Sequence, residues 1–461
     1  MTDIAESSDE RVKKKTRLGA NYWKLWTASV TSNLGDGVAQ IAYPWLASAV
    51  TRNALLIALI AIAQRIPWLV FTLPAGVITD RVDRRKIMTA TSVFRAALTL
   101  GVAAVVFLNQ DALPSPGDVA GGAIGDPNTV VYLTLLASAL LFGIAEVLYD
   151  NAAQTILPAI VEPEALEKAN GRLWGAEMVM NQFVGPPLGS LLVGIAFAVP
   201  FLFDAGTFAV AAALIFALSG AFKADHPDQE GEGERPRFWD EIKEGVKWLW
   251  AHPLLRPMAI ILGLLNGLWS LGAATIVLFA QEVLDATTTT FAVLMMAGAA
   301  GGVIGSVAAP KISQKLGGGT SLFLTLLLMP ATLFVVGVAS NWVLVSVMFF
   351  VSALAGVLWN VITVSLRQTI IPDHLLGRVN SVYRFFGWGM MPIGLAIGGL
   401  LVNGAEAVGT DRVMALRLPY FVSAGALFLV FLWAAPQLTT DKIETARAEG
   451  IATKKHVEDR S

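Results

Sequence analysis

Long apolar stretches separated by short polar segments make up most of the sequence. A helix needs about 20 apolar residues to cross the hydrocarbon core of a membrane, and lipid leaves free backbone groups without hydrogen-bond partners, so such spans are helical. The pattern predicts an all-α membrane protein with twelve transmembrane helices, at residues 25–49, 54–79, 87–109, 130–157, 172–196, 199–222, 256–282, 290–312, 319–339, 342–370, 379–403 and 414–435.

One polar stretch, residues 223–255, divides the spans into two sets of six. Its first part is charged and predicts a flexible linker. Its second part, from Phe238 to Trp250, predicts an amphipathic helix, which either lies in the inner membrane interface or packs on the protein's own inner face. The predicted organisation is a tail at 1–24, a six-helix bundle at 25–222, the linker with its helix at 223–255, a second bundle at 256–435 and a tail at 436–461.

The Lys and Arg residues are distributed unevenly between the two sides of the predicted spans. Of the 33, 27 fall in the two tails, in the central stretch and in alternate loops. The opposite loops carry only Arg52, Arg412 and Arg417. Because loops rich in Lys and Arg stay on the cytoplasmic side, we expect a multi-pass protein of the plasma (cytoplasmic, or cell inner) membrane with both termini in the cytoplasm.

The two predicted bundles share a short sequence pattern. Residues 154–158 read Gln-Thr-Ile-Leu-Pro and residues 368–372 read Gln-Thr-Ile-Ile-Pro, and each segment closes a long span. Asn170 and Asn380 then open the next span in each half. Two similar bundles can rock about a binding site at their interface, so the repeat favours transport by alternating access.

Composition excludes several classes of function. The chain is 55% hydrophobic and 15% charged, whereas soluble domains carry about 25% charged residues. A net charge of −2 gives no case for nucleic-acid binding, and the absence of Cys excludes disulfides and thiolate chemistry. The four His residues lack metal-ligand spacing, and no phosphate-binding G-x-x-x-x-G-K-[ST] loop is present. We therefore expect neither an enzyme nor an ATP-driven pump, with no cofactor and no metal site.

The loop between spans two and three carries a motif. Its sequence from residue 76 to 86 is Gly-Val-Ile-Thr-Asp-Arg-Val-Asp-Arg-Arg-Lys, which resembles the signature of the major facilitator superfamily, with Asp83 in place of the usual Gly. A decayed copy at 305–311 lies in the second half. The resemblance implies two pseudo-symmetric six-helix bundles. It also implies an inner latch formed by Gly76, Asp80, Arg81, Arg84 and Arg85, although these Arg residues also act as topology determinants.

A second motif lies in span five. Gly185, Pro186, Pro187 and Gly189 resemble the glycine-proline motif of exporters that exchange drug for proton, although Ala139 stands where many of these antiporters have an Arg. The segments 32–37 and 238–256 are most similar to the branch of enterobactin (siderophore) exporters and macrolide efflux proteins. In chemistry the motif is structural, because Pro bends a helix and Gly permits close helix packing.

Ionisable residues inside spans are costly and commonly functional. Asp36 and Arg65 lie at similar depth in spans one and two, as a protonation site tuned by a cation or as a static ion pair. Glu146 and Asp150 are four residues apart and share a face of span four. They are candidates for proton coupling, or one of them pairs with an Arg such as Arg95 and braces the bundle.

Residues of the second half complete the candidate site. Glu177 in span five and Arg384 in span eleven occupy equivalent places in the two halves. They either pair across the cavity as an inner gate, closed when the transporter faces outward, or have separate local partners. Trp359 and Asn360 lie deep in span ten and are the preferred contacts for substrate there.

The function favoured by these features is secondary active transport. We expect a monomer that exports an amphipathic small organic molecule, such as a drug, macrolide or siderophore, with protons as coupling ion. The alternatives are an importer or a lipid or metabolite facilitator on the same fold, against which the glycine-proline motif argues, and a non-transporting receptor or scaffold. A scaffold need not tolerate charged residues within its spans.

Overall fold

The computed structural model describes residues 18–125, 128–162, 165–220, 222 and 238–458. Across these residues all regular structure is helical, without a strand. Ten helices in this part of the chain are long and apolar enough to cross a membrane. The two remaining predicted spans, at 25–49 and 54–79, correspond to one long helix and to a pair of shorter ones. The predicted all-α membrane fold is therefore confirmed.

The first bundle is formed by the helices of the N-terminal half, which we call the N bundle. Short helices at Gln110–Ala112, Pro116–Ala120 (α6) and Leu157–Ala159 lie in its connections. Its main helices are α2 (Ala20–Val50), α3 (Ala54–Val70), α4 (Thr72–Arg81), α5 (Arg84–Leu108), α7 (Thr129–Ile156), α8 (Leu166–Val179), α9 (Gly185–Ile195) and α10 (Val199–Phe216).

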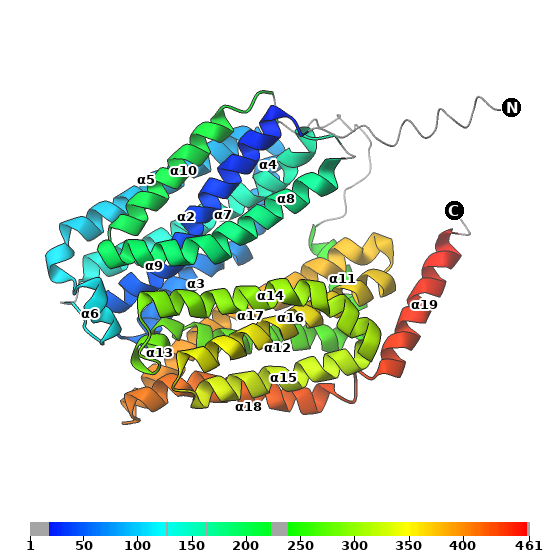
Figure 1. Cartoon of the computed structure of the whole chain (residues 1–461). Helices are drawn as coiled ribbons and strands as arrows, with labels where there is room; N and C mark the ends of the chain where they lie inside the picture. Colours follow the sequence, from blue (N-terminus) through cyan, green and yellow to red (C-terminus); the bar gives the residue numbers. More distant parts are fainter. Residues whose placement is uncertain (1–17, 126–127, 163–164, 221, 223–237, 459–461) are drawn as a thin grey trace.

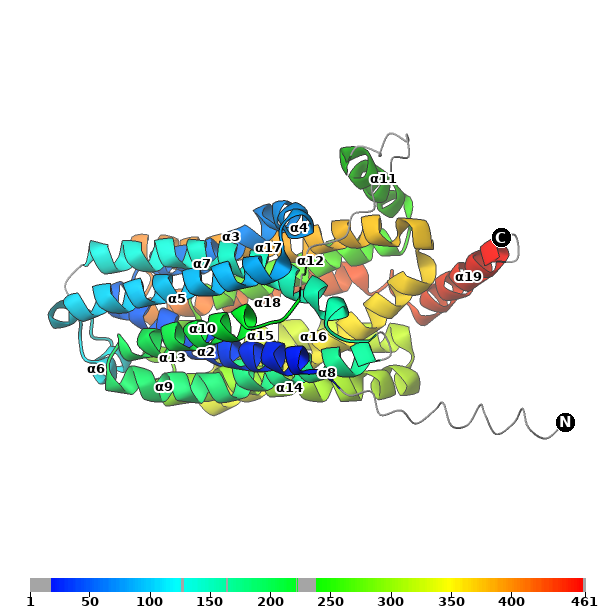
Figure 2. The ribbon, with the colours of Figure 1, turned by 90° about the horizontal axis from the view of Figure 1, so that it is seen from above.

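The second bundle, the C bundle, is formed by the helices after the linker. Figure 1 shows the N bundle packed against it, and the view from above in Figure 2 shows the long helices of both running in one general direction. Its helices are α12 (Leu255–Ala273), α13 (Ile276–Glu282), α14 (Thr288–Leu316), α15 (Gly318–Val338), α16 (Trp342–Ile370), α17 (Asp373–Ala407) and α18 (Arg412–Ala434).

Prolines interrupt two of the predicted spans. The span expected at 54–79 breaks at Phe71, because Pro74 has no N–H to donate to the carbonyl of Val70. The span expected at 172–196 contains one π-helical turn, Met180–Val184 (η5), directly before the motif prolines. Pro186 cannot donate to the carbonyl four residues earlier, and a π turn accommodates the lost bond.

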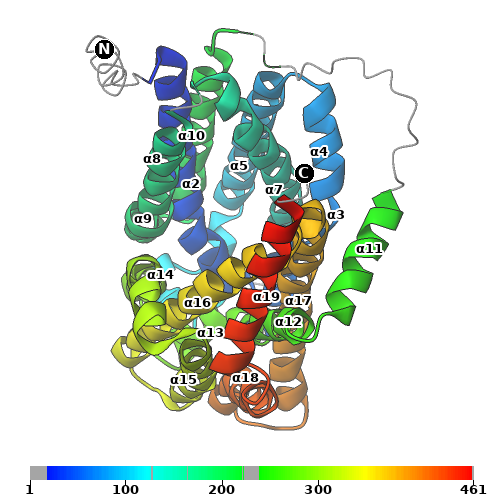
Figure 3. The same ribbon diagram turned by 90° about the vertical axis from the view of Figure 1, so that its right-hand side faces the viewer.

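Two further helices pack on the end of the C bundle near the chain terminus. In α11 (Phe238–Ala251), Leu249 is fully buried, and a Cβ on Gly245 would lie 3.0 Å from the Arg378 carbonyl carbon. The predicted amphipathic helix thus packs on the protein, with Trp250 left exposed; its side chains at 238–242 lie outside the described residues. The second helix, α19 (Thr440–Glu458), crosses the ends of α15 and α16 (Figure 3).

The two bundles meet along two helix pairs, α3 with α17 and α9 with α14. In Figure 1 the bundles lie close together where α6 and α13 are found, and they spread apart toward α8 and α19. We call the end that carries Arg52 and Glu282 the closed end. The opposite end carries both chain termini (Figure 1).

Candidate functional site

Asp36 lies on α2 between two glycines that allow neighbouring helices to approach very closely. A Cβ on Gly35 would lie 2.1 Å from Oδ1 of Asp204, on α10. A Cβ on Gly37 would lie 2.7 Å from the backbone oxygen of Asn181, in the π turn. Real Cβ atoms are not found at such distances, so the backbone atoms near Gly37 admit only glycine there, whereas a larger residue at Gly35 would displace the Asp204 side chain. The packing of two helices therefore fixes the backbone that carries Asp36.

The glycine-proline motif provides one of these neighbours. A Cβ on Gly185 would lie 2.5 Å from Cα of Gly37, and a Cβ on Gly189 would lie 2.7 Å from the carbonyl oxygen of Val38. Pro186 is buried beside them. The motif thus brings α9 into backbone contact with α2 at the level of Asp36. Its role is in helix packing and requires no contact with a substrate.

Arg95 on α5 is the cation that pairs with Asp36. Its Nη1 lies 3.9 Å from Oδ1 of Asp36, and the residue is only 2% exposed. Three rings surround its guanidinium group, with centroids 4.8 to 5.1 Å away, from Phe142, Tyr149 and Phe208. Cation–π contacts of this kind hold a buried guanidinium in place.

The expected pairing of Asp36 with Arg65 is therefore wrong in this structure. Arg65 is exposed on α3, whereas Arg95 reaches Asp36 from α5. Depth along a span, the criterion used to pair them from sequence, does not say which way each helix turns a side chain. The face of α5 that carries Arg95 packs against α7 and α10, where Asp36 is accessible to it.

Asp204 is a further acid near Arg95 that is not among the residues predicted from sequence. It is 1% exposed on α10, and its Oδ1 accepts a long hydrogen bond of 3.4 Å from Thr207. Its Oδ2 has no hydrogen-bond partner within the described residues. A signal was present, because Asp204 is the one acidic residue in the otherwise apolar predicted span 199–222.

Glu146 and Asp150 on α7 join the same group. Both interact electrostatically with Asp36, and Arg95 interacts with Asp150 as well as with Asp36. The exposed Glu177, on α8, is close enough to Glu146 to interact with it. The N bundle therefore collects several acids around one buried guanidinium.

The loop motif ties helices of the N bundle together. Arg84 donates to the carbonyl oxygen of Thr155 at 3.0 Å, and Arg85 donates to that of Leu218 at 2.7 Å. Asp83, in the place of the usual Gly, accepts from the backbone N–H of Lys86 and caps α5. A Cβ on Gly76 would meet nothing within 4 Å, and Arg81 is exposed. The Asp80 side chain lies outside the described residues.

The remaining predicted residues of the C bundle lie apart from this group. Glu177 and Arg384 are both exposed, in a structure whose bundles spread apart at that end. Trp359 is only 2% exposed and belongs to the packed core of the C bundle, whereas Asn360 beside it is exposed. In this conformation only Asn360 of that pair is accessible to a solute.

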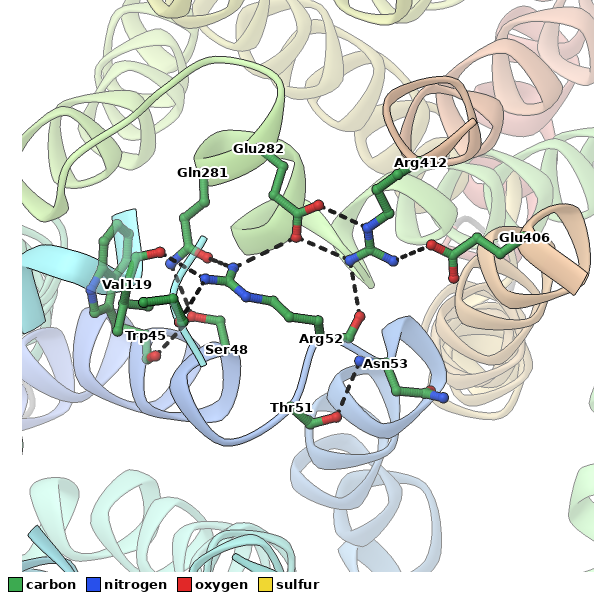
Figure 4. Close-up of polar contacts among 11 residues, drawn as sticks. Trp45, Ser48, Thr51, Arg52, Asn53, Val119, Gln281, Glu282, Glu406 and Arg412 are labelled. Atoms are coloured by element: carbon green, nitrogen blue, oxygen red, sulfur yellow. Dashed lines mark hydrogen bonds and ion pairs between the residues drawn. The ribbon is translucent and has the colours of Figure 1, made fainter. Parts of the chain in front are cut away.

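A network of polar side chains joins the two bundles at the closed end (Figure 4). Arg52 of the N bundle contacts Gln281 and lies 3.6 Å from Glu282, both on α13. Arg412 donates to Glu282 at 2.8 and 3.0 Å and to the backbone oxygen of Arg52 at 2.9 Å. Burial lowers the pKa of Arg52 from its ordinary value, and the attraction of Glu282 opposes this shift. In the sequence, Arg52 and Arg412 stand out only as cations of the outer loops.

Other contacts reinforce the same end. Ser190 on α9 and Thr289 on α14 are hydrogen-bonded at 3.1 Å, and Asn403 donates to Asn53 at 2.8 Å. Farther from the closed end, the rings of Trp68 on α3 and Trp388 on α17 lie 5.6 Å apart. The contacts between bundles thus concentrate where the network lies.

The sequence matches a known protein family and is similar to individual proteins of known type. The family model described as Major Facilitator Superfamily matches residues 25–395. The multidrug efflux pump Tap of Mycolicibacterium fortuitum is 27% identical over 406 residues, which cover 85% of this chain and 91% of Tap. Macrolide efflux protein A of Streptococcus pyogenes is 21% identical over 432 residues, which cover 91% of this chain and 97% of that protein.

Solved structures share the fold. A bacterial homologue of the iron transporter ferroportin in its inward-facing state gives a TM-score of 0.65 at 17% identity, covering 90% of this chain and 98% of that one. A bacterial homologue of the iron transporter ferroportin in its outward-facing state gives a TM-score of 0.52 at 16% identity, covering 90% and 99%. The nucleoside transporter NupG gives 0.65 at 9% identity, covering 91% and 99%.

Proposed function

This chain belongs to the Major Facilitator Superfamily, and we propose that it is a proton-coupled exporter of amphipathic small organic molecules that works by alternating access. That it is a membrane transporter follows from the family. The outward direction, the proton and the chemical class of the substrate are the proposed part, and relatives named as efflux pumps support the direction. Drugs and macrolides, which the names of those relatives mention, are the first solutes to test.

One observation carries the proton coupling. The buried Arg95 pairs with the partly exposed Asp36 within the N bundle, beside further acids on α7 and α10. Charged groups in this setting are expensive and are retained where they serve transport or proton relay. Asp36 has a side chain that is 22% exposed, so it can exchange protons with water, whereas Arg95 cannot lose its charge.

The distribution of contacts between the bundles supports alternating access. The Arg52 and Arg412 network closes one end, and the bundles spread apart at the end that carries the termini. With both termini in the cytoplasm, as the basic residues predict, the closed end faces outward and this conformation is open inward. The higher TM-score with the inward-facing ferroportin homologue supports the same assignment.

In the proposed cycle, protonation of Asp36 or Glu146 changes the relative stability of the two conformations. A proton or a solute shifts that equilibrium only as far as it binds one conformation better than the other. In the outward-open state, Glu177 and Arg384 would approach each other and close the inner side. We propose that the protein acts as a monomer in the cytoplasmic membrane.

Transport by the purified protein in liposomes tests the proposal. An imposed pH gradient should drive movement of ethidium, a fluorescent amphipathic cation, and Asp36→Asn and Glu146→Gln should each reduce this movement at least tenfold. Asp441→Asn, which alters an exposed acid on α19, is the matched control. Movement that ignores the gradient and survives both substitutions would replace the proposal with a facilitator.

A further inference from the structure

Asp204 is more deeply buried than Asp36, lies against α2 at Gly35, the residue before Asp36, and interacts electrostatically with Asp36. The backbone of α2 at Gly35 presses on the Asp204 carboxyl group, to which a Cβ at that position would come within 2.1 Å. Asp204 is 1% exposed, and the sole hydrogen bond that reaches its side chain within the described residues is the long one from Thr207. An ionised carboxylate so placed is strongly disfavoured unless a cation compensates it.

Arg95 is the cation available to Asp204. It interacts electrostatically with Asp204 as well as with Asp36, and the three rings around its guanidinium keep it within the bundle. Its Nε has no hydrogen-bond partner in the described part of the chain, so the guanidinium is not fully engaged by its present ion pair. Arginine remains charged at all accessible pH values. Because Arg95 is buried, a carboxylate must compensate its charge.

Charge balance limits how many of these acids are ionised together. Titratable groups interact with this guanidinium and its two acids from the helices packed around them, namely Asp36 and Tyr43 on α2, Glu146, Tyr149 and Asp150 on α7 and Asp204 on α10, and Glu177 on α8 interacts in turn with the acids of α7. One guanidinium compensates one carboxylate. In this conformation Asp36 lies within ion-pair distance of Arg95, at 3.9 Å, so an ionised Asp204 would lack a cation of its own.

We propose that Asp36 and Asp204 share one proton and that Arg95 pairs with whichever of the two lacks it. When the proton passes from Asp204 to Asp36, one O–H bond breaks and one forms, and the total charge of the three groups stays zero. Asp36, the more exposed acid, exchanges the proton with water, and Asp204 stores it out of reach of water. The inference rests on the proposed proton coupling and assigns Asp204 as a positioning residue for the Arg95 charge.

The pH dependence of transport tests this role. In Asp204→Asn the alternative partner of Arg95 is gone, so protonating Asp36 would leave this buried cation without either assigned partner and with Asp150 on α7 as the remaining acid that interacts with it. The pH at which gradient-driven ethidium movement is half-maximal should therefore move to more acidic values by about 1 unit or more, the usual effect of one nearby charge. Asp204→Glu should restore the wild-type profile, and Asp441→Asn should not change it.

Infrared spectroscopy of the purified full-length protein gives a test that does not depend on transport. At neutral pH the wild type should show the carbonyl stretch of a protonated carboxyl group that Asp204→Asn lacks. Asp36→Asn should also lose it, because Arg95 then has Asp204 as its partner. Identical carboxyl bands in the wild type and Asp204→Asn would overturn the inference.

The two proposals fail in different ways. If the wild type is not driven by a pH gradient, the proposed function fails, and the infrared bands alone decide the shared proton. If the wild type is driven and Asp204→Asn has an unchanged pH profile, the role of Asp204 fails and proton-coupled export stands.

Discussion

Gln281 on α13 donates a hydrogen bond to Ser48 on α2 at 2.9 Å, and both side chains are buried although they belong to different bundles. The same Gln281 also accepts from Arg52 (Figure 4). To open the closed end, the protein must break these bonds and hydrate the groups. The contact therefore favours the conformation seen here.

Replacing Gln281 by Leu should shift the protein toward the conformation that is open at this end. The closed form loses one neutral hydrogen bond and one to a charged group, together worth about 1.5 kcal/mol or more, which is about a tenfold change in population. Because the chain has no Cys, spin labels can be placed at Asp111→Cys and Val408→Cys, both exposed. Their distance distribution should gain a longer component, and Gln437→Leu, at the opposite end, should leave it unchanged.

A disulfide between α9 and α14 should lock the closed end. The side-chain oxygens of Ser190 and Thr289 are 3.1 Å apart, which is compatible with the short Cβ separation that a disulfide requires. Ser190→Cys with Thr289→Cys should lose transport on oxidation and regain it on reduction, while each single variant remains active. Full activity of the oxidised double variant would show that this end does not open during transport.

Gly37→Ala should destabilise the N bundle. The added Cβ would lie 2.7 Å from the Asn181 backbone oxygen and 2.9 Å from Cα of Gly185, and backbone atoms cannot move aside cheaply. We expect a loss of about 1–3 kcal/mol in the free energy of unfolding, with reduced transport. Gly101→Ala, where a Cβ meets nothing within 4 Å, is the control for thermal unfolding and should be neutral or slightly stabilising. Equal stability of the two variants would contradict the tight contact.

His252 should make stability depend on pH. Its Nδ1 accepts from the backbone N–H groups of Leu254 and Leu255, and burial lowers its pKa, with Glu449 opposing the shift. The unfolded chain then binds a proton more readily than the folded one. The stabilisation is complete above the unfolded pKa of about 6.5 and is lost as the pH falls below it.

Thermal unfolding between pH 8 and pH 5 should separate the wild type from His252→Asn. Asn offers an oxygen for the same N–H groups but does not titrate in this range. On acidification, the unfolding temperature of the wild type should fall further than that of the variant. Parallel curves would show that His252 contributes no proton linkage.

The order of apolar stretches was enough to predict the membrane fold. Hydropathy fixes where a chain can cross lipid, because an unpaired backbone group in the hydrocarbon core is too costly. The motif at 76–86 resembled the signature of the family, and the glycines and prolines at 185–189 indicated close helix packing, which is a local requirement. The acids and Arg residues within spans were also visible as candidates.

Which of those residues meet was decided by tertiary structure alone. Asp36 pairs with Arg95 rather than Arg65, and Asp204 joins them from a helix 168 positions along the chain, because the rotation of each helix sets the direction of its side chains. Arg52, Gln281 and Arg412 were polar residues near span ends in the sequence, and they became a network only when two bundles met. The hydropathy of a segment depends on that segment alone. An ion pair forms only when two segments are placed so that their side chains meet, and this placement is set by the tertiary structure.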